Sequence, residues 1–440
     1  MGNHWRGHSL KVRSLLFSAM IGLLLLSGVL WISYLSNLKE EARTFSEVKA
    51  FFKGSDQEVE VYHLFGKERG PTVLIFAGIH GDESAGYLAA ERFVGLKLLK
   101  GNLIIVPRLN LYAIFTGKRT GLSGGDMNRK FLPSEEEKDP DDKIVGLAKS
   151  LIDQADIILN LHQGYGFYSL VWIDHARNPI RWGQCNVIDI STYNLPDGRR
   201  LSLEHFANEV AQKINSKLKD KKYHFHVNNT NTFSERSLHK EQRGSLTYYA
   251  LAWKHKMAFG IEATKNCSLP QGVGFITLAV NAMLEEAGIR AEAFPSIFTA
   301  VIADELKRNE EFSGLRVKIN GVEKLILPKK EILLTPGDQF QILSVEAEHP
   351  RGWYPSLSGS NLYNGIGKVF SITQSDQLIL KKYGKRVAVF NIMLKENIPF
   401  QSETGPHSLI LTLSNTKERN PLSIEWRGSY GFQFKTDTCH

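Results

Sequence analysis

The feature that most constrains the fold of this chain is a series of strand–turn–helix units that begins at residues 71–91. The apolar stretch 73–77 (VLIFA) predicts a buried strand, and a helical pattern starts at about Ser84. Gly78 and Gly81 lie between them and allow the backbone to turn. Polar residues in such a turn lie at the carboxyl edge of a parallel sheet, where open α/β sheets bind their ligands.

The same alternation continues along the chain as far as residue 161. The predicted elements are, in order, an edge strand at 58–66, the strand at 73–77, a helix at 84–99, a strand at 103–106, a helix at 142–154 and a strand at 157–161. Strands that alternate with helices become neighbours in a mostly parallel or mixed sheet flanked by helices. We therefore predict an α/β domain over residues 36–293.

The sequence pattern changes at about residue 294. The rest of the chain contains short alternating strands separated by Gly, Pro and charged turns, and Asn320 followed by Gly321 is a hairpin signal. Since no helical pattern separates these strands, they predict all-β modules. Their length suits two small β domains, at 294–358 and 359–440. We expect these domains to present substrate or contact protein partners, or otherwise only to shield the α/β domain.

Near the N-terminus, residues 15–35 carry no charge. As a helix this segment would rise about 31 Å, which is enough to cross a bilayer. We predict an uncleaved membrane anchor in preference to a removed signal segment. Lys11 and Arg13 place residues 1–14 on the cytoplasmic side, although basic residues also follow the segment. With this orientation, the chain from about Asn37 onward would lie outside the cytoplasm.

The composition of the 440 residues is that of an ordinary globular protein, with 42% hydrophobic and 23% charged residues. The net charge of +8 is spread along the chain, so it does not favour a nucleic-acid partner. Three cysteines, at 185, 267 and 439, form neither a zinc-finger pattern nor a dense disulfide framework. An oxidising compartment would allow one disulfide, which we place between Cys185 and Cys267.

His80 and Glu83 lie on the turn that follows the first buried strand. An imidazole and a carboxylate three residues apart can bind one cation, and zinc accepts both donor types. The alternative is a simple turn in which Asp82 or Ser84 caps the helix. A later apolar strand, DIILNLHQG, delivers His162 to the same predicted edge. Two histidines and a glutamate with an open fourth position match a catalytic zinc site, so we predict one Zn²⁺ per chain.

Other polar residues occur in similar positions. The turn GGDMNR carries Asn128 and Arg129, and Arg119 precedes it. An amide beside a guanidinium can bind a carboxylate, and a second arginine can stabilise a developing oxyanion. A third apolar strand, AFGIEATKN, presents Glu262, which is a candidate for proton transfer. Each residue taken singly is equally consistent with ordinary surface or a salt bridge, but their shared positions favour an active site.

The motifs GIHGDE, GKRT, GGDMNR, LNLHQG and GIEATKN, in this order, resemble those of the zinc carboxypeptidase superfamily, which includes succinylglutamate desuccinylases and aspartoacylases. The similarity covers roughly residues 60–290. With its anchor and β-rich tail, the chain is most similar to bacterial D,L-carboxypeptidases that trim peptidoglycan stem peptides and control helical cell shape. Two features depart from the family: Leu238 and His239 occupy the region of a usual tyrosine, and His80 stands where this branch can carry glutamine.

The resemblance implies a role for each candidate residue. His80, Glu83 and His162 would be the zinc ligands. Arg119 would polarise the scissile carbonyl, Asn128 and Arg129 would bind the terminal carboxylate of the substrate, and Glu262 would be the general base and acid.

The implied substrate is a stem tripeptide that ends in meso-diaminopimelate, linked through the γ-carboxylate of D-Glu, and the product is the dipeptide stem. Cell-shape proteins would be partners of the β modules. Two other functions stay open at this point. One is a zinc-dependent deacylase of acylated amino acids, and the other is a peptide-binding scaffold that has lost catalysis.

Overall fold

The computed structural model describes residues 27–28, 46–134, 136–360 and 362–395, and the backbone of three strands at 410–413, 422–425 and 433–434. The predicted cytoplasmic tail at 1–14 and most of the predicted anchor at 15–35 lie outside the described residues, as does Cys439. Within the described ranges, no helix combines the length and the apolar character needed to cross a membrane.

The chain divides into two compact units, Met1–Met393 and Leu394–His440. The second contains a small sheet with the strand order β22 (Ile410–Leu413), β23 (Leu422–Glu425) and β24 (Gln433–Phe434). The first contains an α/β domain and a β domain.

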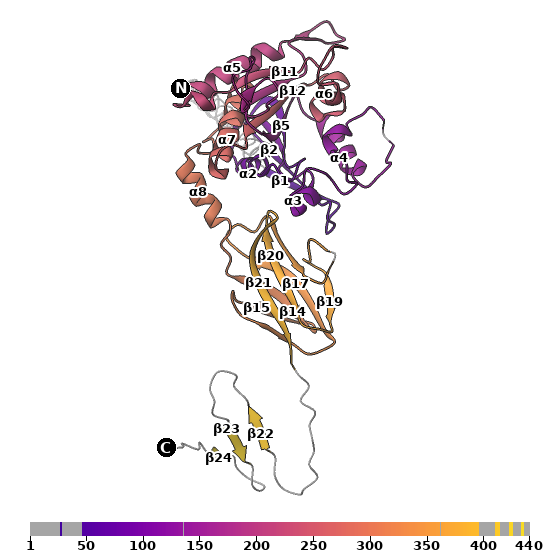
Figure 1. Cartoon of the computed structure of the whole chain (residues 1–440), viewed down its shortest axis with the longest axis vertical. Helices are drawn as coiled ribbons and strands as arrows, with labels where there is room; N and C mark the ends of the chain where they lie inside the picture. The colour runs from indigo at the N-terminus through magenta and orange to yellow at the C-terminus, as the bar shows by residue number, and fades with distance from the viewer. Residues whose placement is uncertain are drawn as a thin grey trace, which may run out of the picture. The chain divides into compact units, whose positions relative to one another are not determined.

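A nine-stranded mixed sheet forms the centre of the α/β domain (Figure 1). In sheet order its strands are β1 (Ser46–Phe51), β2 (Val59–Phe65), β4 (Leu98–Val106), β3 (Glu68–Phe76), β5 (Ile157–Gly164), β12 (Met257–Thr264), β8 (Cys185–Ile188) and β11 (His226–Asn229), with β13 (Arg290–Ala291) beside β4. The four central strands, β4, β3, β5 and β12, are parallel, and both ends of the sheet contain antiparallel pairs. The predicted mixed α/β sheet is therefore confirmed. The segment at 58–66 was predicted as an edge strand, but β2 lies between β1 and β4.

Helices cover both faces of this sheet (Figure 1). They are α2 (Ser84–Glu91), α3 (Leu111–Thr116), α4 (Asp142–Ile152), α5 (Leu203–Ser216), α6 (Leu246–Ala252) and α7 (Leu269–Glu286), followed by α8 (Thr299–Arg308). Val73 and Ile75 pack into the core that α2, α5 and α7 share, whereas Leu74 and Phe76 pack into the core of α4 and α6. Because successive side chains of a strand point to opposite faces, a strand buried on both faces reads as one apolar run. The predicted helix at 84–99 is shorter, since α2 ends at Glu91 and Leu98 already belongs to β4.

The short elements of this domain are two strand pairs and three 3₁₀ turns. These are β6 (Phe167–Tyr168) with β7 (Arg177–Asn178), β9 (Tyr193–Asn194) with β10 (Arg200–Leu201), η1 (Met127–Arg129), η2 (Lys221–Tyr223) and η3 (Lys240–Gly244). Of these, η1 and η3 contribute to the site described below.

The β domain consists of two four-stranded sheets. One has the order β15 (Val322–Ile326), β14 (Gly314–Ile319), β17 (Asp338–Glu346), β19 (Val369–Ile372), and the other β16 (Ile332–Leu334), β21 (Lys385–Leu394), β20 (Asp376–Lys382), β18 (Trp353–Leu357). The predicted hairpin joins β14 to β15, with positive φ angles at Asn320 and Gly321. The predicted domain boundary near residue 358 falls inside this domain, because β17 pairs with β19 and β18 with β20 across it. The structure divides the chain at Leu394 instead.

Lys382 is a buried cation in the β domain. Its side chain is 2% exposed, and Nζ donates hydrogen bonds to the carbonyls of His349 (2.7 Å) and Arg351 (2.6 Å). Burial lowers the pKa of Lys382 to about 7, below the value of about 10.4 for an unfolded chain. Between these two pH values the unfolded state binds a proton that the folded state has released. This buried charge therefore destabilises the fold most below pH 7, and the penalty disappears as the pH rises.

We expect Lys382→Met to be more stable relative to the wild type at pH 6.5 than at pH 9. The measurement is the urea midpoint of unfolding of the full-length protein at both pH values. Lys330→Met, at an exposed lysine of the same domain, is the control for removal of one lysine charge. A wild-type to Lys382→Met difference that does not change with pH would contradict the assignment of a cationic, desolvated lysine.

Candidate metal centre and active site

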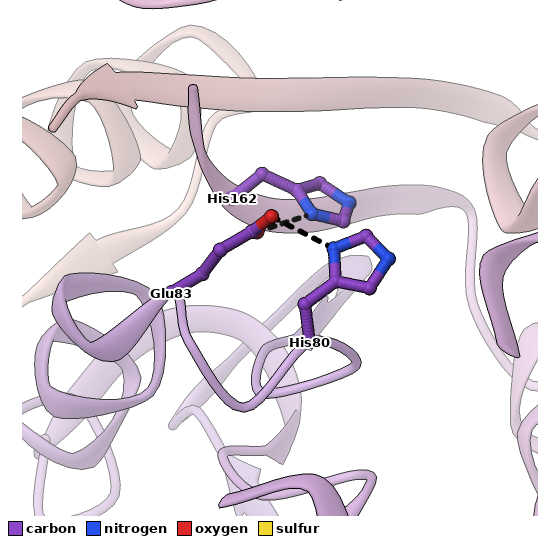
Figure 2. A group of neighbouring side chains, drawn as sticks. All are labelled: His80, Glu83 and His162. Atoms are coloured by element: carbon purple, nitrogen blue, oxygen red, sulfur yellow. Dashed lines mark hydrogen bonds and ion pairs between the residues drawn. The ribbon is translucent and has the colours of Figure 1, made fainter. Parts of the chain in front are cut away.

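Three side chains from two strand ends converge at the carboxyl edge of the central sheet (Figure 2). His80 and Glu83 lie on the turn between β3 and α2, and His162 belongs to the last part of β5. Glu83 lies between the two imidazole rings: its Oε1 is 2.8 Å from Nδ1 of His80, and its Oε2 is 2.8 Å from Nδ1 of His162. The predicted convergence of these residues is therefore what the structure contains.

The donor set fits a divalent metal ion. One ligand atom from each of the three residues lies within 4.8 Å of the others, and all three side chains are buried. Burial tends to raise the pKa of Glu83, but the two imidazoles hold it well below its ordinary value, so the carboxylate stays ionised. Burial also lowers the pKa of His162 and favours the neutral ring. An ionised carboxylate and a neutral imidazole are the forms that bind metal.

Asp126 supports this cluster and was missed by the sequence reasoning. Its Oδ1 is 3.0 Å from Nε2 of His80, and its Oδ2 accepts a hydrogen bond of 2.9 Å from Arg119. A carboxylate on the far nitrogen of a ligating imidazole fixes the tautomer and orientation of the ring. The available signal was position, since Asp126 lies in the same GGDMNR motif, two residues before the assigned Asn128.

Backbone groups also hold the cluster in place. The amide N–H of Gln163 donates to Oε2 of Glu83 at 3.1 Å, and the Gln163 side chain accepts from the N–H of Ala85 at the start of α2. The strand end that carries His162 is thus tied to the helix that follows Glu83. This accounts for the fixed position of a carboxylate that lies outside any strand.

Arg119 is half exposed beside the cluster. Its Nη1 donates to Oε1 of Glu83 at 3.1 Å, and its other nitrogens bind Asp126. Asn128 is buried, and its side-chain oxygen accepts from the N–H of Leu246 at 3.0 Å, so only its NH₂ group is available to donate to a ligand. Arg129 Nη1 donates to the carbonyl of Asn128. Both residues belong to η1.

Glu262 lies beside the cluster on the neighbouring strand. In the pairing of β12 with β5 it is directly opposite His162. Its Oε2 is buried and has no hydrogen-bond partner among the residues that the structure describes. Burial and the nearby carboxylate of Glu83 raise the pKa of Glu262 well above its ordinary value. A raised pKa strengthens the affinity of a carboxyl group for a proton, which suits a group that takes a proton from water and passes it on.

One cavity of about 370 Å³ joins these residues. All seven sequence-predicted residues line it: His80, Glu83, Arg119, Asn128, Arg129, His162 and Glu262. In the region of the missing family tyrosine, Leu238 is exposed, and the His239 ring packs on Trp182, which lines the cavity. The structure thus brings the whole predicted set together.

The disulfide predicted between Cys185 and Cys267 is absent. Both thiols are free, and each donates to a different backbone carbonyl, of Trp182 at 3.1 Å and of Thr264 at 3.2 Å. Cys185 is buried under the active-site face of the sheet, opposite Glu262 in β8. The prediction was wrong because it relied on compartment alone, and pairing depends on the distance and direction of the two side chains.

Solved structures of known proteins are similar to this chain in fold. The cell shape determinant protein Csd4 from Helicobacter pylori, in its product-bound form, is 20% identical with a TM-score of 0.52, covering 77% of this chain and 100% of that chain. The mDAP-bound form of Csd4, described as a D,L-carboxypeptidase, is 20% identical with a TM-score of 0.50, covering 74% and 97%. At this level of identity the likeness is one of fold.

A curated relative matches over a shorter stretch. N-alpha-acetyl-L-2,4-diaminobutyric acid deacetylase from Halomonas elongata is 35% identical over 100 residues, which are 22% of this chain and 29% of that protein. The chain therefore matches less than a third of the length of this relative.

Residues 53–295 match the sequence pattern of a family described as "Carboxypeptidase controlling helical cell shape catalytic". The matched region covers more than half of the chain and includes the cluster of His80, Glu83 and His162, the supporting Asp126, and Glu262. The chain therefore belongs to the family of carboxypeptidases that control helical cell shape, and residues 53–295 are its catalytic domain.

Proposed function

We propose that this protein is a zinc-dependent carboxypeptidase that removes the last residue of peptidoglycan stem tripeptides and thereby affects cell shape. The observation that carries the proposal is the buried cluster of His80, Glu83 and His162, with Glu262 beside it in one cavity of a carboxypeptidase domain. Two imidazole nitrogens and one carboxylate are the donor set of catalytic zinc sites in peptidases.

Each step of hydrolysis has a residue suited to it. Bound zinc would supply the Lewis acidity that polarises the scissile carbonyl and activates water. Arg129 and the NH₂ group of Asn128 would hold the terminal carboxylate of the peptide through charge-assisted hydrogen bonds. Arg119, 3.1 Å from Glu83, is placed to stabilise negative charge that develops beside the metal ligands. Glu262 would take the proton of the attacking water and deliver it to the departing amine.

The substrate proposal has a second source of support. Solved forms of Csd4 include a tripeptide-bound and an mDAP-bound structure. By analogy of fold and family, we assign to this chain the bond between the γ-carboxylate of D-Glu and meso-diaminopimelate. Such a substrate would be met outside the cytoplasm, which agrees with the uncharged segment 15–35 as an inner-membrane anchor. Protease treatment of spheroplasts tests this location, since a periplasmic domain would be digested and a cytoplasmic one protected.

The full-length protein, incubated with defined muropeptides, is expected to convert the tripeptide stem to the dipeptide with release of meso-diaminopimelate. Mass spectrometry of the products measures the conversion. A chelator is expected to abolish it and added zinc to restore it, because the proposed hydrolysis needs a bound metal ion. Among the described residues, His80, Glu83 and His162 form the one group that could hold such an ion. Unchanged tripeptide with the zinc-loaded enzyme would contradict the substrate assignment.

One observation favours a second function. Over 100 residues the chain is similar to a deacetylase that acts on an acylated diamino acid. Acylated amino acids are therefore the alternative substrates to test. If the protein cleaves Nα-acetylated amino acids in the same assay and leaves the muropeptides uncleaved, it is a deacylase. Binding of either substrate without turnover by metal-loaded protein would instead identify a scaffold.

A further inference from the structure

The active-site cavity continues from the metal cluster down one face of the sheet. Strand pairing places His162, Glu262 and Cys185 in one row across β5, β12 and β8. Two residues away on each strand lies a second row, formed by Asn160, Gly260 and Val187. Residues two apart on a strand point to the same face and are separated by roughly 6.6 Å. The second row therefore forms a floor one step below His162 and Glu262, and all three of its residues line the cavity.

Gly260 keeps this floor open. A Cβ added at Gly260 would lie 3.1 Å from Cβ of Val187, so a side chain here would occupy the space between the two neighbouring strands. Thr247 of α6 lines the same cavity from the helix that covers this face. The result is a space between sheet and helix beside Asn160.

Asn160 is the unusual member of the floor. Its side chain is 1% exposed, yet neither the amide nitrogen nor the amide oxygen has a hydrogen-bond partner in the part of the chain that the structure describes. Buried amides are nearly always hydrogen-bonded, because an unsatisfied donor or acceptor pays the full cost of leaving water. An amide with both ends free in a cavity next to the reacting groups is therefore available to a ligand.

We propose that Asn160 recognises the side chain of the residue that the enzyme releases, and that this floor takes a side chain ending in both a hydrogen-bond donor and an acceptor. The inference rests on the proposed carboxypeptidase function and adds the determinant of its substrate choice. The distal ammonium and carboxylate of a diaminodicarboxylic acid satisfy the oxygen and the NH₂ group of one amide. An apolar side chain would displace water from the amide and replace none of its hydrogen bonds.

The test uses four peptides, L-Ala-γ-D-Glu-X, that differ only in the last residue. X is meso-diaminopimelate, L-lysine (no distal carboxylate), L-2-aminopimelate (no distal ammonium) or L-norleucine (neither). The wild-type enzyme is expected to prefer meso-diaminopimelate over norleucine in kcat/KM, with the other two between them. In Asn160→Leu this preference is expected to fall by about 100-fold. Norleucine bound to the wild-type enzyme leaves the buried Asn160 amide without hydrogen bonds, and the leucine variant has no amide to leave unsatisfied.

A matched control is Asn186→Leu. Asn186 is also a fully buried asparagine with an unsatisfied oxygen, but it lies on β8 facing α5, where its NH₂ group donates to the carbonyl of Ala207. This variant is expected to keep the wild-type ratio between the four substrates. Metal content and thermal unfolding of both variants are measured alongside the kinetics.

Asn160→Asp provides an independent measurement if Asn160→Leu does not fold. Its carboxylate is expected to raise the preference for lysine over 2-aminopimelate by at least tenfold, because it accepts from an ammonium and repels a carboxylate. An unchanged preference in a folded, metal-loaded Asn160 variant would overturn the inference and leave the proposed function intact. Failure of the wild-type enzyme to cleave any of the four peptides would overturn the proposed function itself.

Discussion

Glu262→Gln is expected to lower kcat on the stem tripeptide by about 10²–10⁴-fold, the range for loss of a general acid–base group. Glutamine keeps the shape of the side chain but can neither take a proton from water nor deliver one to the leaving amine. Because Glu262 is not one of the three residues of the metal cluster, we expect the variant to bind metal as the wild type does. Steady-state kinetics with the muropeptide, together with metal analysis of the purified proteins, measures both effects.

The raised pKa of Glu262 gives this prediction its physical basis. Burial and the Glu83 carboxylate both disfavour the charged form of Glu262. Its carboxylate therefore binds a proton more tightly than an ordinary glutamate does. Glu285→Gln, at an exposed position of α7, is the control for a Glu to Gln change without a role in the cavity. Turnover by Glu262→Gln within tenfold of the wild type would rule out Glu262 as the proton carrier and return the scaffold and deacylase hypotheses to consideration.

Glu83→Gln is expected to weaken metal binding by more than about 100-fold. Loss of an outer partner of a metal ligand already costs 10–100-fold, and Glu83 is a direct member of the donor set. Glu83 is also the shared partner of His80 and His162, each 2.8 Å away. The variant removes the negative charge that both rings and Arg119 face, so the positions of three other residues depend on it.

Thermal unfolding with and without zinc measures this loss separately from activity. A ligand that binds only the folded state stabilises it by about 2.7 kcal/mol at 100 times its Kd. We expect this stabilisation in the wild type and in Glu285→Gln, and its absence in Glu83→Gln at the same zinc concentration. If the Glu83→Gln protein gained the full stabilisation, metal would be bound elsewhere and the cluster would have only a structural role.

The sequence was most informative where chemistry and local structure coincide. An apolar run followed by glycines and a polar turn predicts a strand end, and parallel strand ends share one edge of a sheet. This reasoning predicted that His80, Glu83 and His162 would meet, although 79 residues separate the glutamate from the second histidine. It also placed Glu262 at a strand end of the same kind, and the structure brings Glu262 beside His162 because β12 is a parallel neighbour of β5.

Other features depended on contacts between distant segments. The predicted domain boundary near residue 358 failed because strand pairing across it is not visible in local turn signals. The predicted disulfide between Cys185 and Cys267 was wrong because the spacing of cysteines in the sequence contains no information on side-chain direction. Asp126 was missed because its role is defined by a ring nitrogen 46 residues away.

By itself, then, the sequence determined the α/β class, the donor types of the metal cluster and the residues that accompany it, since these depend on periodicity and on side-chain chemistry within short motifs. Only the tertiary structure decided the order and register of the strands. Register places Asn160 one row below His162 and beside a glycine, and it leaves the amide of Asn160 buried without a partner. Such a group has no local signature, because its burial and its missing hydrogen bonds arise from strands and a helix that are far apart in the chain.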